Sequence, residues 1–192
     1  MDNRIKVMIV EDDLVWMKGI SDLISKEKDM VVVKKAFTKS EALQLENHEI
    51  DIILMDLTLS EDEELGGLDL SKELVERGFQ KIIMLTSWEE PAIILDSFDH
   101  GAMNYINKSS YKNIPKFIRE AFIDKVTLNA DVSSLLINEL RIERKASILT
   151  PAEREVYKLK EKGLTRGQIA EHLFKSVETI KKQLKTIKKK LK

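Results

Sequence analysis

Residues 5–13 read Ile5-Lys6-Val7-Met8-Ile9-Val10-Glu11-Asp12-Asp13, a short apolar run that ends in three acids. Runs of this length that are rich in Ile and Val are typical of strands buried in a parallel sheet. Similar runs occupy residues 30–33, 50–55 and 81–85, and a weaker one occupies residues 104–106. The sequence therefore predicts five buried strands.

Stretches with helical spacing of apolar residues alternate with these strands. They cover residues 14–26, 40–46, 68–76, 91–98 and 114–122. Pro91 and Pro115 suit first helical turns, because the first N–H groups of a helix have no partner within it. The alternation predicts an α/β fold, a five-stranded parallel, doubly wound (flavodoxin-like) sheet with helices on both faces. In such folds the ligand site lies beyond the carboxyl ends of the strands.

Length and composition bound the class of protein. The chain has 192 residues, 43% of them apolar, which suits two small globular domains and excludes a large multidomain enzyme. It has no Cys, which excludes disulfides and thiolate zinc sites, and its three His lack ligand spacing. Arg4 and Lys6 interrupt the first apolar run, and no run is long enough to span a bilayer. We expect a cytoplasmic protein with no signal peptide and no membrane partner.

Charge divides the chain into two unlike parts. Residues 1–146 carry 19 Lys and Arg against 28 Asp and Glu, a net charge of −9, whereas residues 147–192 carry 13 against 5, a net charge of +8. Such asymmetry indicates a basic module for nucleic acid or a membrane surface joined to an acidic partner domain, or else a solvated charged helix.

Polar side chains follow the carboxyl ends of the predicted strands. Glu11 and Asp12 follow the first strand, Asp56 the third, Thr86 the fourth and Lys108 the fifth. Carboxylates gathered in a small space repel one another, and a hard divalent cation such as Mg2+ relieves that repulsion. With Mg2+ and the lysine neutralising phosphoryl oxygens and the threonine donating to another, Asp56 could attack phosphorus. The pattern indicates an aspartyl phosphate.

These residues resemble the receiver domain of two-component response regulators. The resemblance rests on Ile9-Val10-Glu11-Asp12-Asp13, Asp56, Thr86-Ser87 and Tyr105-Ile106-Asn107-Lys108. It covers about the first 125 residues, which we take as a receiver domain, residues 1–125.

The resemblance implies a role for each matching residue. Asp56 would be the phosphoacceptor, and a sensor histidine kinase would supply the phosphoryl group. The implied Mg2+ ligands are Glu11, Asp12, Asp56 and the carbonyl of Thr58, and Asp13 follows the acidic pair. The implied phosphoryl-binding or switch residues are Thr86, Tyr105 and Lys108. The protein would not be an enzyme, although it would assist its own phosphotransfer and dephosphorylation.

Two features near the predicted site leave alternatives open. Residues 60–67 form a loop that is longer and more acidic than is usual in receivers. Its acids could strengthen metal binding or repel the phosphodonor, but we favour a solvated charge run. Trp16 and Trp88 follow strand ends, where they could flank the site, pack in the core or contact a partner.

The rest of the chain is predicted to be helical, with recognisable capping residues at the helix starts. Residues 126–146 predict a helical linker, which could transmit the receiver's state, form a dimer contact or merely pack one apolar stripe. Residues 147–192 predict three helices. Thr150 and Thr165 begin capping boxes, and a third helix starts at Ser176, so the last two helices form a helix-turn-helix candidate.

The third of these helices has two contrasting faces. Its apolar stripe comprises Val177, Ile180, Leu184, Ile187 and Leu191. The adjoining face carries Lys181, Lys182, Lys185, Lys188, Lys189 and Lys192. A helix buried on one side and lysine-rich on the other suits contact with DNA, because neutralised phosphates release counterions.

This segment resembles the LuxR-type helix-turn-helix. The resemblance rests on Leu149-Thr150-Pro151-Ala152-Glu153-Arg154-Glu155-Val156, Gly163-Leu164-Thr165, Gln168-Ile169-Ala170 and Ser176-Val177-Glu178-Thr179-Ile180-Lys181. It implies double-stranded promoter DNA as a partner. The implied groove contacts are Thr179, Lys182 and Lys185, and the implied phosphate contacts are Lys181 and Lys189.

The sequence therefore predicts a response regulator in which phosphorylation of Asp56 controls homodimerisation and DNA binding, and hence transcription. One alternative is a constitutive DNA-binding regulator whose receiver serves only for dimerisation. Another is a Mg2+-dependent phosphohydrolase with Asp56 as nucleophile. Phosphohydrolases of the haloacid dehalogenase type carry a second acid two residues after the nucleophile, and here that position is Thr58.

Overall fold

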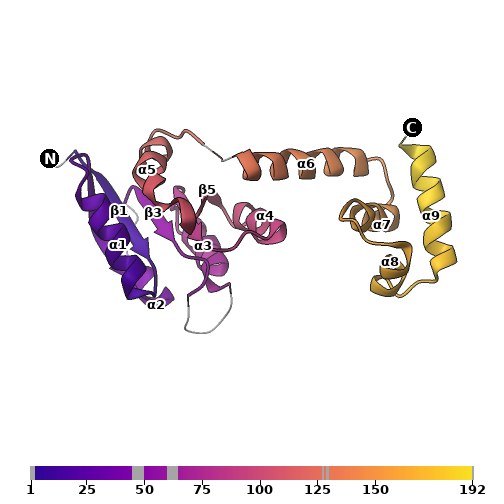
Figure 1. Ribbon diagram of the computed structural model, residues 1–192, viewed down its shortest axis with the longest axis horizontal. Helices are drawn as coiled ribbons and strands as arrows, with labels where there is room; N and C mark the ends of the chain where they lie inside the picture. The colour runs from indigo at the N-terminus through magenta and orange to yellow at the C-terminus, as the bar shows by residue number, and fades with distance from the viewer. Residues whose placement is uncertain (1–2, 45–49, 60–64, 127, 129, 192) are drawn as a thin grey trace. The chain divides into compact units, whose positions relative to one another are not determined.

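The computed structural model describes residues 3–44, 50–59, 65–126, 128 and 130–191 (Figure 1). The chain divides into two compact units, a first unit, Met1–Val132, and a second unit, Ser133–Lys192. Each unit is described by itself. No helix among the described residues is both long enough and apolar enough to cross a membrane.

A five-stranded sheet forms the centre of the first unit. Its order is β2-β1-β3-β4-β5, and every neighbouring pair is parallel. The strands are β1 (Ile5–Val10), β2 (Met30–Ala36), β3 (Ile52–Met55), β4 (Ile82–Thr86) and β5 (Ala102–Asn107). This topology confirms the predicted doubly wound α/β fold, because the chain crosses from β2 at one edge over β1 to β3.

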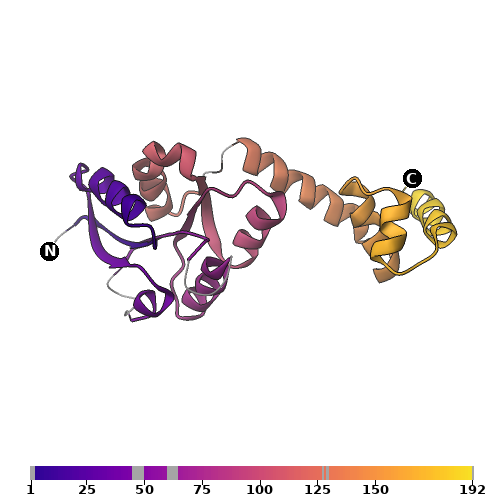
Figure 2. The ribbon, with the colours of Figure 1, turned by 60° about the horizontal axis from the view of Figure 1, so that its bottom comes forward.

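Helices cover both faces of this sheet, as Figure 2 shows. They are α1 (Leu14–Ser25), α2 (Lys39–Ala42), α3 (Gly66–Glu76), α4 (Pro91–Asp99), the 3-10 helix η2 (Lys108–Asn113) and α5 (Ile114–Phe122). Apolar residues of α1 and α5 share one core with alternate residues of the strands, including Val7, Ile52 and Ile83. Intervening strand residues such as Met8 and Met84 are equally buried on the other face. Both faces are therefore apolar, as parallel strands require.

Two elements of the first unit differ most from the ranges that the sequence predicts. β2 continues three residues past Val33, through Lys34 and Lys35 to Ala36. An edge strand has a partner on one side only, so it tolerates charged side chains that a central strand would exclude. The helix predicted for residues 40–46 is the shorter α2, Lys39–Ala42. The last two residues of that predicted range lie outside the described part of the chain.

The second unit is helical. The linker helix α6 spans Ala130–Ala146, so it begins three residues before the boundary between the units. The three helices that follow are α7 (Pro151–Glu161), α8 (Arg166–His172) and α9 (Val177–Lys190). Both predicted capping boxes are present: Thr150 pairs with Glu153 at the start of α7, and Thr165 pairs with Gln168 at the start of α8. The core combines the end of α6 with these three helices, and it includes Ile142, Ala146, Val156, Ile169, Ile180 and Ile187.

One predicted core residue of this unit is exposed. Val177 retains 51% of its surface, whereas Ile180 and Ile187 of the same predicted stripe are buried. Val177 is the first residue of α9, and the stripe becomes buried only one turn later. The prediction for Val177 is therefore wrong.

Candidate functional site

The carboxyl ends of β1 and β3 bring three acids together. Glu11 and Asp12 follow β1, and Asp56 follows β3, which pairs in parallel with β1. One carboxylate oxygen from each of these three residues lies within 4.8 Å of the other two. Such a set of hard oxygen donors fits a small divalent cation such as Mg2+.

Lys108 joins two of these acids. It begins η2 directly after β5, and its Nζ lies 2.9 Å from Asp56 Oδ2 and 2.8 Å from Glu11 Oε2. All three side chains are almost fully buried. Burial alone would lower the pKa of Lys108, but the contacts with Asp56 and Glu11 outweigh it, and the pKa is raised. The ammonium group is therefore charged at neutral pH.

Glu11 is the acid of the cluster whose ionised form is disfavoured. Burial and the neighbouring charge of Asp56 raise its pKa from 4.5 to about 7, although Lys108 opposes the shift. A carboxylate held in this state gains from any additional cation, because a cation favours the ionised form. The site thus has too much negative charge for one lysine to balance.

Asp13, the third acid after β1, caps a helix. Asp13 is the N-cap of α1, and its Oδ1 accepts hydrogen bonds from the backbone N–H groups of Val15 at 2.7 Å and Trp16 at 3.1 Å. This bond pattern satisfies the free N–H groups of the first helical turn. Asp13 therefore positions α1, and it is not a member of the three-carboxylate cluster.

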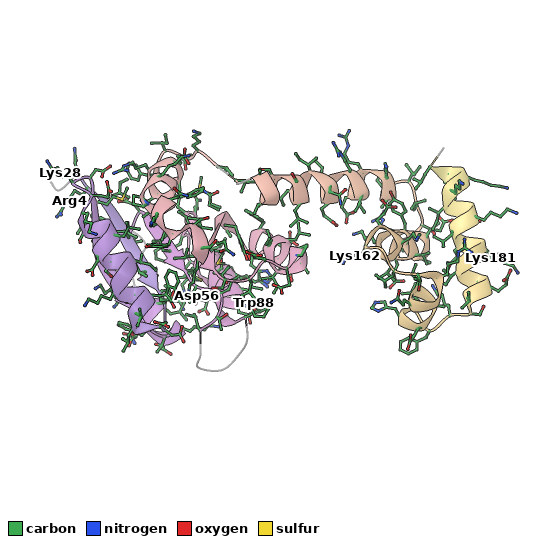
Figure 3. All side chains as sticks on the ribbon, in the orientation of Figure 1. Arg4, Lys28, Asp56, Trp88, Lys162 and Lys181 are labelled. Atoms are coloured by element: carbon green, nitrogen blue, oxygen red, sulfur yellow. The ribbon has the colours of Figure 1, made fainter. Side chains whose placement is uncertain are left out.

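Trp88 connects three elements around the site. Its backbone N–H donates to Thr86 Oγ1 at 3.3 Å, and its indole Nε1–H donates to Thr58 Oγ1 at 3.0 Å. Tyr105 is buried and donates its hydroxyl hydrogen to the Trp88 carbonyl at 2.6 Å. Burial raises the pKa of Tyr105, so its hydroxyl keeps the proton that it donates. Figure 3 labels Asp56 and Trp88 in the first unit.

Gly67 holds the segment after Asp56 against α3. Its N–H donates to the carbonyl of Leu57 at 2.9 Å. A Cβ atom at this position would lie 2.2 Å from the carbonyl oxygen of Asp56 and 2.8 Å from Leu57 Cα. Only glycine permits this approach, because the atoms that a side chain would meet belong to the backbone.

The other predicted site residues fall into three groups. The hydroxyl of Thr58 faces the Trp88 indole, while the role predicted for its carbonyl stays a prediction. Of the acidic loop 60–67, residues 60–64 lie outside the described part of the chain. The predicted DNA contacts are all exposed on α9 of the second unit: Thr179, Lys181, Lys182, Lys185 and Lys189.

Comparisons with known proteins agree with this geometry. Residues 7–118 match the family described as the response regulator receiver domain. The chain belongs to this family. Transcriptional regulatory protein YdfI of Bacillus subtilis (strain 168) is 31% identical to this response regulator, over 97% of the chain and 89% of the relative. LiaR of the same organism is 28% identical, over 97% of the chain and 90% of the relative.

Solved structures of response regulators resemble the chain along almost its whole length. The RcsB–DNA complex has a TM-score of 0.66 and 26% identity, and the match covers 98% of this response regulator and 92% of the RcsB chain. A structure of RcsB from Salmonella typhimurium has a TM-score of 0.62 and 25% identity, and here too the match covers 98% and 92% of the two chains. The predicted family, a response regulator with a LuxR-type second unit, is confirmed.

Two residues beside the site, Trp88 and Gly67, were not given a definite role from the sequence. The direction of the Trp88 indole depends on the conformation of the loop after β4, for which the sequence carries no signal. Gly67 does carry a signal, because a pair of glycines follows the acidic loop at the start of a helix. Glycine at such a place indicates a close backbone approach, but not which atoms approach.

Proposed function

We propose that this response regulator accepts a phosphoryl group on Asp56 from a sensor histidine kinase, and that the modification controls binding of promoter DNA by the second unit. The observation that carries the proposal is the buried contact of Lys108 with both Asp56 and Glu11 beside a third carboxylate. This arrangement puts Asp56 beside the Lys108 ammonium group, in a site that can hold a second cation. A transferring phosphoryl group needs such positive charge around its oxygens.

Mg2+ would be held by Glu11, Asp12 and Asp56, with the carbonyl of Thr58 as a further ligand, and would supply positive charge for the phosphoryl oxygens. The carboxylate of Asp56 attacks phosphorus, and the bond between phosphorus and the donor's leaving group breaks. Lys108 then pairs with one phosphoryl oxygen. The hydroxyl of Thr86 donates to another. The chain's part in this transfer is positioning and charge.

The hydrogen bonds of Trp88 suggest how the modification is relayed. When the Thr86 hydroxyl turns to the phosphoryl group, its bond with the Trp88 N–H changes, because both use the same oxygen atom. Tyr105 follows because it donates to the Trp88 carbonyl. We therefore place Thr86, Trp88 and Tyr105 on the route from Asp56 to the surface of the first unit.

Intact mass after incubation with Mg2+ and acetyl phosphate tests the acceptor. We expect one phosphoryl group on the wild type and none on Asp56→Asn. Asp51→Asn is the matched control, because Asp51 stands before β3 and accepts from the backbone of Lys6 at 2.8 Å, which an amide oxygen can also do. Modification of Asp56→Asn, or loss of modification in Asp51→Asn, would contradict the assignment.

The second unit supplies the DNA-binding surface of this proposal. Lys182 and Lys185 are exposed on α9, and Figure 3 labels Lys181 on the same helix. We expect the Lys182→Ala, Lys185→Ala double variant to bind DNA more weakly. Its plot of log affinity against log salt should be flatter, because two fewer cations lie against the DNA and fewer counterions are released on binding.

A second pair of lysines controls for overall charge. Lys160 lies in the last turn of α7, and Lys162 is the C-cap residue of that helix. Both are exposed, and Figure 3 labels Lys162. Replacing both with Ala removes the same charge from the same unit. We expect the salt slope of this control, measured by fluorescence anisotropy, to stay near that of the wild type. Equal slopes for the two double variants would refute α9 as the contacting helix.

We also propose that the phosphorylated protein forms a homodimer in the cytoplasm, where promoter DNA is available to it. One of the similar solved structures holds two RcsB dimers bound to two parallel DNAs. In this chain Ile137 and Leu140 of α6 are exposed apolar residues that a dimer could cover. Sizing before and after phosphorylation tests the point, and an unchanged monomer would contradict it.

The two alternative functions predict different results. A constitutive regulator would bind DNA equally before and after phosphorylation, and Asp56→Asn would leave binding unchanged. A phosphohydrolase would turn over phosphate esters. That second alternative lacks support, because the residue two positions after Asp56 is Thr58, whose hydroxyl accepts a hydrogen bond from Trp88.

A further inference from the structure

Phe174 occupies the turn between α8 and α9 in an unusual state. It is 98% exposed, and its φ angle is +51°. The turn is closed by two backbone bonds, from the Phe174 N–H to the Glu171 carbonyl at 3.1 Å and from the Lys175 N–H to the Ala170 carbonyl at 2.8 Å. This left-handed position after a helix usually holds glycine or asparagine.

The same chain uses glycine at three other left-handed positions after helices. Gly78 follows α3 with φ +94°, Gly101 follows α4 with φ +90°, and Gly163 follows α7 with φ +88°. Asp124 follows α5 with φ +57°, and aspartate is one of the few other residue types that tolerate this region. A side chain with a Cβ atom is disfavoured in this conformation. The ring of Phe174 cannot offset that cost by packing, because almost all of its surface is exposed. Folding of the second unit therefore gives no reason for an aromatic residue here, which points to a contact outside this unit.

The neighbours of Phe174 indicate which contact. Ser176 caps α9, and Val177, its first residue, is also exposed and apolar. Exposed lysines continue along the same helix at Lys181, Lys182 and Lys185. The surface thus has two exposed apolar residues at the start of α9, with the exposed Glu178 beside them, and is basic further along. A helix that enters the major groove presents its first residues to the base edges, and phosphates lie beside it.

We propose that the ring of Phe174 contacts double-stranded DNA and packs on an apolar part of it, beside the lysines of α9. This proposal rests on the proposed function of the second unit. The apolar surface of DNA comes from thymine methyl groups in the major groove or from deoxyribose. Charge complementarity favours an acidic partner, because residues 147–192 carry a net charge of +8, and DNA is the acidic partner that the proposed function gives to the second unit.

The test separates folding from binding in the full-length chain. The variants are Phe174→Gly, which suits the left-handed backbone, and Phe174→Ala. Ile148→Ala is the matched control, because Ile148 is an apolar residue of the same unit that is 62% exposed outside this turn. The probe is a duplex selected on the wild-type chain from a random-sequence pool. Melting temperature and anisotropy are measured for every protein.

We expect Phe174→Gly to keep or raise the melting temperature while its DNA affinity falls roughly fivefold or more, the loss typical of a base-edge contact. Ile148→Ala should bind as the wild type does. Affinity equal to wild type in both Phe174 variants would overturn the proposal. So would a fall in affinity that goes with a fall in melting temperature for Phe174→Gly, because that would indicate a structural role.

Two further measurements identify which part of the DNA the ring contacts and distinguish failure of this inference from failure of the proposed function. If thymine-to-uracil substitution weakens the wild type but not Phe174→Ala, the ring contacts a methyl group. If the substitution changes the affinity of the wild type and of Phe174→Ala equally, while Phe174→Ala still binds DNA more weakly than the wild type, the ring packs on deoxyribose. A wild-type chain that binds no duplex, phosphorylated or not, would overturn the proposed function and this inference together. Binding by the wild type with unchanged Phe174 variants would overturn the inference alone.

Discussion

The Gly67→Ala variant is expected to lose about 3 kcal/mol of its free energy of unfolding, at the upper end of what overpacking usually costs. The added Cβ would lie 2.2 Å from the carbonyl oxygen of Asp56 and 2.8 Å from Leu57 Cα. Both are backbone atoms, so no side-chain rotation can relieve the clash. The start of α3 or the segment after β3 must move, and either movement displaces Asp56. Phosphorylation of the variant should therefore also be slower.

Gly66→Ala is the control for this prediction. Among the described residues, a Cβ at Gly66 would meet only the Leu59 carbonyl oxygen, at 3.9 Å, which is an ordinary contact. Alanine also favours helix over glycine, so this neighbour should be unchanged or slightly more stable. Urea unfolding followed by tryptophan fluorescence measures both, because Trp16 and Trp88 belong to the first unit and report its unfolding. Similar midpoints for the two variants would show that α3 does not need glycine at residue 67.

The Glu11→Gln variant is expected to be about 2 kcal/mol more stable than the wild type at pH 8 and to lose its response to Mg2+. In the folded chain the pKa of Glu11 is raised from 4.5 to about 7. Each unit of such a shift corresponds to about 1.4 kcal/mol. The variant also loses the attraction between Lys108 and Glu11, which reduces the gain.

The pH dependence gives the sign of this effect. A carboxyl group whose pKa is raised by folding binds its proton more tightly in the native state than in the unfolded state. Its contribution to the free energy of unfolding therefore falls as the pH rises. The penalty from Glu11 is absent below pH 4.5 and complete above about pH 7. The difference in stability between Glu11→Gln and the wild type should therefore grow between these two values.

Thermal unfolding at several pH values, with and without Mg2+, measures both parts of the prediction. Glu89→Gln is the control, because Glu89 is an exposed acid that accepts from Asn107 at the same end of the sheet and is not in the carboxylate cluster. It should follow the wild type in pH dependence and in stabilisation by Mg2+. A difference for Glu11→Gln that stays constant from pH 5 to pH 8 would contradict the raised pKa.

The sequence predicts the site well where strand polarity alone decides the geometry. Glu11, Asp12 and Asp56 follow parallel strands that are neighbours in the sheet, so they must meet at one edge. Lys108 follows the last strand and reaches the same edge. The N-caps at Thr150 and Thr165 are also predictable, because each capping box is complete within four residues.

Features that depend on tertiary packing are not predictable in this way. The bond from Trp88 to Thr58 joins two loops whose conformations no local pattern specifies. The exposure of Val177 depends on which neighbours face the first turn of α9. The extension of β2 through Lys34 and Lys35 depends on its place at the edge of the sheet, and strand order is a property of the whole unit.

The two units differ in how far along the chain their contacts reach, and this has a consequence for folding during synthesis. The parallel sheet pairs Val7 with Ile52, so a strand can pair only after a segment distant in the sequence has been synthesised. The helices α7 and α8 start at caps made by their own residues. Chains with local contacts fold faster than those with distant ones. The slower unit is the one that leaves the ribosome first, and its sheet can form while the faster unit is still being made.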